Sequence, residues 1–104
     1  MNKLSLPVAF RPYEIACFKL QSEEVQAVLG EPHGSESAST RTYGGVELYW
    51  AYELNGERFV LVCRVPYSDT VIYSESQKPQ GVLEKLMELF PSAEVEIYVK
   101  PSPT

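Results

Sequence analysis

The sequence predicts an α+β fold: a single domain of two helices and a largely antiparallel sheet, in the order β-α-β-β-β-α-β. Three observations support this prediction. An Asn-Gly pair at residues 55–56 separates two strand-like runs, which is the strongest short-range signal of a β-hairpin. Two short segments place apolar residues three and four positions apart, as amphipathic helices do. The length of 104 residues suits one domain with its own core.

The chain before the hairpin is expected to contain a lead-in, a strand, a helix and a loop. Residues 1–12 form the lead-in, which contains two prolines. Residues 13–20, YEIACFKL, alternate in polarity and are rich in β-formers, so they predict a strand. The small polar residues 34–40, GSESAST, predict a flexible loop.

The first helix is predicted between these two segments. Ser22 is its expected N-cap, and Gly30 followed by Pro32 is expected to end it. His33, the only histidine in the chain, comes directly after this stop. Its position favours a structural role beside the helix end. The apolar stripe of this helix is Val25, Val28 and Leu29.

The hairpin at residues 46–65, VELYWAYELNGERFVLVCRV, is the most informative part of the sequence. A two-residue turn at Asn55-Gly56 fixes the register, and side chains alternate between the two faces of a strand. The face expected to point inward pairs Tyr52 with Phe59, Trp50 with Leu61, Leu48 with Cys63 and Val46 with Val65. The outer face pairs Glu53 with Arg58, Ala51 with Val60, Tyr49 with Val62 and Glu47 with Arg64.

The remaining chain predicts a strand, a helix and a final strand. Residues 68–76 predict the first of these strands, and the helix that follows residues 79–81 ends at Pro91. The apolar stripe of that helix is Val82, Leu83, Leu86, Met87 and Phe90. Residues 93–100 predict the last strand, and residues 101–104 a frayed tail. The inward side chains expected on the last strand are Val95, Ile97 and Val99.

Composition excludes several function classes. A net charge of −5 argues against nucleic acid and anionic membrane surfaces, but it is compatible with a basic protein partner. No apolar run is long enough for a membrane span or a secretory signal, so we expect a cytoplasmic protein. Two cysteines among apolar neighbours indicate buried thiols, and neither they nor the single histidine form a metal-site pattern. We therefore expect no metal and no cofactor.

We also expect no enzymatic activity. A nucleophilic cysteine needs a base, and nothing in the sequence requires Cys17 or Cys63 to lie near His33. The chain contains no nucleophile elbow, phosphate-binding glycine loop or zinc-protease motif.

The outer hairpin face is the predicted binding surface. Its apolar centre with a charged rim is typical of protein interfaces, and tyrosine is well suited to such contacts. The alternative is that the second helix or an N-terminal segment covers this face. The predicted contact residues are Glu47, Tyr49, Glu53 and Arg64 on the hairpin, with Glu31 and His33 in the adjacent loop.

The pattern SEEVQAVLGEPHG followed by VELYWAYELNGERFVLVCRV resembles small bacterial α+β proteins in which a short helix ends in LGxP before a meander with W-x-Y. Two groups have this pattern: toxin immunity proteins and the SmpA/BamE-like outer-membrane assembly lipoproteins. The acidic, non-catalytic character is similar to that of the immunity proteins. This resemblance implies a cytoplasmic protein that neutralises a bacterial toxin by binding it, and it carries over no individual residue.

The sequence thus predicts a non-enzymatic protein-binding domain whose partner is a protein, such as a basic toxin domain. Two alternatives remain open at this stage. One is a small-molecule-binding or enzymatic α+β domain with a cleft between sheet and helices, near His33 or Cys17. The other is a structural subunit that forms a homodimer through the same hairpin face.

Overall fold

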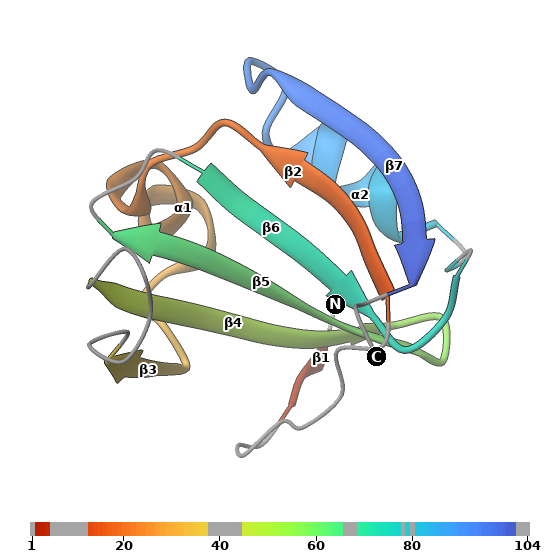
Figure 1. Ribbon diagram of the computed structural model, residues 1–104, viewed down its shortest axis with the longest axis horizontal. Helices are drawn as coiled ribbons and strands as arrows, with labels where there is room; N and C mark the ends of the chain where they lie inside the picture. The colour runs from red at the N-terminus through yellow and green to blue at the C-terminus, as the bar shows by residue number, and fades with distance from the viewer. Residues whose placement is uncertain are drawn as a thin grey trace.

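The molecule is built on a seven-stranded sheet in which every pairing is antiparallel. A computed structural model describes residues 2–4, 13–37, 45–65, 69–77, 79 and 81–101. Its elements are β1 (Asn2–Lys3), β2 (Tyr13–Phe18), α1 (Ser22–Leu29), β3 (Gly34–Ser37), β4 (Val46–Leu54), β5 (Glu57–Val65), β6 (Asp69–Ser74), α2 (Val82–Leu89) and β7 (Val95–Pro101). The strand order is β1-β4-β5-β6-β2-β7, and β3 also pairs with β4 (Figure 1).

Both helices lie on one face of the sheet, behind it in Figure 1. Their buried residues pack with the inward side chains of β2, β4, β5 and β6 in one continuous core. The largest fully buried side chains of that core include Trp50, Phe18, Phe59, Ile15 and Leu61. The chain is therefore a single α+β domain, as the sequence predicts. No helix in the described part of the chain has the length and apolar character needed to cross a bilayer.

The β4–β5 hairpin confirms the predicted register pair by pair, from Val46 opposite Val65 to Leu54 opposite Glu57. Asn55 and Gly56 both have positive φ, 54° and 79°, as the two central residues of a type I′ turn require. The inward face is buried as expected, except at the open end of the hairpin, which is the end away from the Asn55-Gly56 turn. There Val46 is 40% exposed, because the core cluster reaches Leu48 and goes no further along the strand.

Helix α1 begins and ends close to the predicted residues. The cap is Gln21 and not Ser22: the backbone N–H of Gln21 donates to Oε1 of Glu24 at 2.9 Å, which is half of a capping box. At the other end, the Gly30 N–H donates to the Gln26 carbonyl at 2.8 Å. Gly30 has φ +82° and ψ −162°, a conformation that is essentially restricted to glycine.

The periphery of the fold differs from the expected boundaries in three places. The expected loop at residues 34–40 begins as strand β3, which pairs with β4; residues 38–40 lie outside the described residues. The lead-in contains β1, although residues 5–12 also lie outside the described residues. Strand β7 includes Pro101, the first residue of the expected tail, while 102–104 are not described.

Besides Val46 and Val28, two other apolar side chains that were expected to face the core are substantially exposed. Ile97 is 53% exposed because β7 is the last strand of the sheet and pairs only with β2 among the described strands. Met87 is 36% exposed, since α2 buries Val82 and Leu86 and turns Met87 toward solvent.

Candidate functional site

The outer hairpin face is a second, smaller core. Ala51, Val60 and Val62 are 0%, 2% and 1% exposed, and Leu4, Tyr49 and Tyr73 pack against them. The N-terminal segment therefore contributes to covering this face, through Leu4. The prediction of an exposed apolar centre was wrong, since these three side chains are buried, and the contact of Leu4 agrees with the alternative that an N-terminal segment helps to cover the face.

The charged rim of that face is organised by strand β6 and the residues after it. Arg58 contacts Glu75 through two hydrogen bonds from Nε and Nη2 to Oε2, at 2.9 and 2.6 Å. This pairing raises the pKa of Arg58 and lowers that of Glu75. Arg64 donates from Nε to Oδ1 and from Nη2 to Oδ2 of Asp69, across β5 and β6. Glu47, one of the predicted contact residues, is only 7% exposed.

The turn that holds His33 is fastened to the outer edge of β4. The His33 N–H donates to the Tyr49 carbonyl at 2.7 Å, and its Nδ1 accepts the Ala51 N–H at 2.9 Å. The His33 ring meets the Tyr52 ring edge-on, with 4.9 Å between centroids. Trp50 completes the attachment by donating its indole N–H to the Gly30 carbonyl at 3.0 Å.

His33 thus lies between β3 and β1, the two short strands that pair with the same edge of β4. Strand β3 pairs with Val46 to Tyr49, and β1 pairs with Tyr52 and Glu53. Between these two paired stretches of β4, the Ala51 N–H donates to Nδ1 of His33. Because Nδ1 acts as an acceptor, the ring is the neutral tautomer with its proton on Nε2. Burial, and secondarily the charge of Lys3, lower the pKa of His33, so the neutral ring is favoured.

The cysteines are buried on the sheet and are poorly placed for catalysis. Burial raises the pKa of both the Cys17 and the Cys63 thiol, which disfavours the reactive thiolate. Cys17 lies on β2, three strand spacings or about 14 Å across the sheet from β4, which carries the His33 turn. No group of three or more His, Cys, Asp or Glu side chains among the described residues is placed to hold a metal ion.

The predicted contact residues do not form one surface. Glu53 and Arg64 lie at opposite ends of the hairpin, since Arg64 is opposite Glu47, six residues or about 20 Å along β4 from Glu53. Tyr49 is half-buried and its carbonyl holds His33, whereas Glu31 is exposed on the turn. The structure therefore brings Tyr49 to His33 and places Arg64 opposite Glu47, two residues along β4 from Tyr49, whereas Glu53 lies at the other end of the hairpin.

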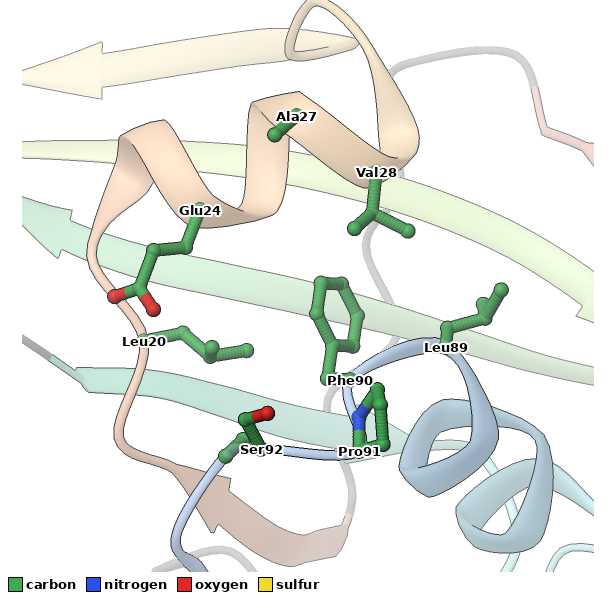
Figure 2. A pocket seen from close by; sticks show the side chains of 9 residues that line it. Leu20, Glu24, Ala27, Val28, Leu89, Phe90, Pro91 and Ser92 are labelled. Carbon is green, nitrogen blue, oxygen red and sulfur yellow. The ribbon is translucent and has the colours of Figure 1, made fainter.

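An apolar hollow on the helical side of the molecule is the better candidate. This interhelical depression lies between α1 and the end of α2 and has a volume of about 290 Å³ (Figure 2). Its lining consists of Leu20, Glu24, Ala27, Val28, Leu89, Phe90, Pro91, Ser92 and Ala93. In Figure 2 the Phe90 ring stands between the helices, facing Val28. Val28 is 44% exposed, which is unusual for a residue of a helix stripe.

The elements around the interhelical depression are predominantly acidic. Helix α1 carries Glu23 and Glu24 and has no Lys or Arg. On α2, the Lys85 ammonium lies 3.9 Å from the Glu88 carboxylate, so its charge is partly balanced. Glu94 follows the lining residue Ala93 and is exposed. The surroundings favour a ligand that combines apolar groups with positive charge.

The sequence alone does not predict this depression. Val28 belongs to a regular apolar stripe, and only the placement of the two helices shows that it is left partly uncovered.

Comparison with known protein families, curated proteins and solved structures gives no significant match.

Proposed function

We propose that this chain is a non-enzymatic protein-binding domain that acts in the cytoplasm as an immunity protein, neutralising a bacterial toxin by binding a basic part of it. The observation that carries the proposal is the interhelical depression, an exposed apolar hollow with acidic surroundings. An apolar centre with polar surroundings is the usual anatomy of a protein interface. The negative charge of the whole chain would speed encounter with a basic partner.

The other candidate functions have less support. The alternative of a small-molecule or catalytic domain places its cleft near His33 or Cys17, and neither residue lines the depression. Its polar side chains are those of Glu24 and Ser92, whereas a small-molecule site usually presents several convergent polar groups. A homodimer through the hairpin face would need the apolar surface of Ala51, Val60 and Val62, which one chain already encloses.

The test is direct binding to the protein encoded by the neighbouring gene. We expect a complex in calorimetry and protection of bacterial growth when the two are co-expressed. The variant Val28→Asn should weaken the complex, and Val46→Asn should not, because Val46 is equally exposed but lies at the open end of the hairpin. A neighbouring gene product that is toxic yet neither bound nor inhibited would refute the toxin-immunity assignment.

A further inference from the structure

We infer that the interhelical depression takes an amphipathic segment of the partner protein, with one or two large apolar side chains entering beside Val28 and a Lys or Arg reaching Glu24. The inference rests on the proposed protein-binding function and specifies which part of a partner that site would take.

The size and floor of the depression define the apolar part of the ligand. A volume of about 290 Å³ lies at the lower end of small-molecule pockets, roughly 300–1,000 Å³. It therefore suits a few side chains and not a whole cofactor. Phe90 is 6% exposed and meets Phe18 edge-on at 6.4 Å, so the floor is tied to the core of the sheet. Such a floor can receive an apolar group without prior rearrangement.

The charged part of the ligand follows from Glu24. Its carboxylate lies at the border of the depression and accepts the Gln21 N–H, which anchors it to the first turn of α1. A carboxylate has about four acceptor positions, so this bond leaves capacity for a cationic partner. Glu23 and Glu94 adjoin lining residues in the sequence and are exposed. Among the described residues the nearby lysines are Lys19, which is exposed, and Lys85, whose ammonium lies 3.9 Å from the Glu88 carboxylate. The local field therefore favours cationic segments over anionic ones.

A helical segment fits this combination better than an extended one. Recognition of an extended strand uses backbone groups of a sheet edge, whereas the depression is bordered by helices and a turn. An amphipathic helix places apolar anchors at positions i, i+3 and i+4, with cationic side chains beside them. The partner element is therefore an amphipathic, basic helix.

The experiment uses the full chain and two synthetic peptides of about 14 residues, roughly the length at which an isolated helix becomes marginally stable. One is an amphipathic helix of Leu and Lys, and the other has Glu in place of every Lys. Binding is measured by calorimetry, and the site is mapped from the methyl NMR signals of Leu20, Val28 and Leu89. The variants are Val28→Asn with Val46→Asn as its control, and Glu24→Gln with Glu84→Gln as its control.

We expect the Lys peptide to shift the methyl signals of the depression and the Glu peptide to bind at least about tenfold more weakly. Val28→Asn should weaken the Lys peptide several-fold to tenfold, and Glu24→Gln about two- to fivefold, the range for an exposed ion pair. Gln can still cap α1, so the second effect reports charge alone. Ala27→Arg, which should preserve the helix and block the hollow, gives an independent check if Val28→Asn unfolds.

Equal binding of both peptides, equal losses in the Val28 and Val46 variants, or no response at the three methyl groups would overturn the inference. Its failure is separable from that of the proposed function. A toxin that binds the chain with Val28→Asn as tightly as the unaltered chain contradicts the inference and leaves toxin immunity intact. A chain that binds the Lys peptide in the depression but no toxin contradicts only the immunity assignment.

Discussion

Replacing His33 by leucine tests whether this residue holds the turn after α1 to the sheet. Leucine keeps much of the apolar bulk but removes the Nδ1 acceptor of the Ala51 N–H. A part-buried amide that loses its only acceptor costs about 1–3 kcal/mol. Because His33 is half-buried and water can reach part of the site, we expect the lower part of that range, about 1–2 kcal/mol.

Asparagine at the same position is the matched variant. Its Oδ1 is attached to Cγ, as Nδ1 is in histidine, so it can still accept the Ala51 N–H. It loses the edge-on contact with Tyr52, worth about 0.5–1.5 kcal/mol for an aromatic pair, and should cost less than about 1 kcal/mol at this half-buried site. Glu31→Ala on the same turn is exposed and should stay within about 0.5 kcal/mol of the unaltered chain.

Urea unfolding at about pH 8, where His33 is neutral, measures these differences as changes in midpoint at constant slope. The expected order of stability is unaltered chain and Glu31→Ala, then His33→Asn, then His33→Leu. The reasoning fails if His33→Leu unfolds at the same urea concentration as the unaltered chain, or if asparagine is as damaging as leucine.

Three further predictions follow from the same structure. The folded state lowers the pKa of His33 from 6.5, so the contribution of His33 to stability is complete above pH 6.5 and declines as the pH falls below it. The difference in free energy of unfolding between the unaltered chain and His33→Asn should therefore shrink from about pH 7.5 to about pH 5. A difference that stays constant over this range would contradict the prediction. Gly30→Ala should cost about 1–3 kcal/mol in urea unfolding through backbone strain, since no heavy atom beyond the two neighbouring residues in the chain lies within 4 Å of the added Cβ; a neutral result would mean that the turn adopts another conformation. Val62→Ala should cost about 2 kcal/mol for two buried CH₂ equivalents and a small cavity, whereas an exposed interface residue would lose less than about 0.5 kcal/mol in the same measurement.

The hairpin shows what local sequence signals can determine. The Asn55-Gly56 turn requires two residues with positive φ, and this requirement sets the partner of every residue in β4 and β5. Trp50 and Leu61 are consequently buried at 0% and 1% exposure. The prediction succeeds because turn geometry and side-chain alternation act over a few residues.

The features that sequence reasoning missed depend on distant contacts. Residues 34–37 have the small polar composition of a loop, yet they pair with β4 because the His33 turn delivers them to its edge. Tyr49 and its outer-face neighbours alternate like a solvent-facing surface, but Leu4 reaches them from the N-terminus. The interhelical depression likewise depends on the spacing of two helices about sixty residues apart in the chain.

Methyl NMR of the chain bound to the proposed protein partner tests the central claim, that such a partner docks between the two helices. The prediction is that the signals of Val28 and Leu89 change on binding while those of Val60 and Val62, enclosed on the opposite face, stay in place. Large changes at Val60 and Val62 with none at Val28 would contradict the account and return the binding surface to the outer side of the hairpin.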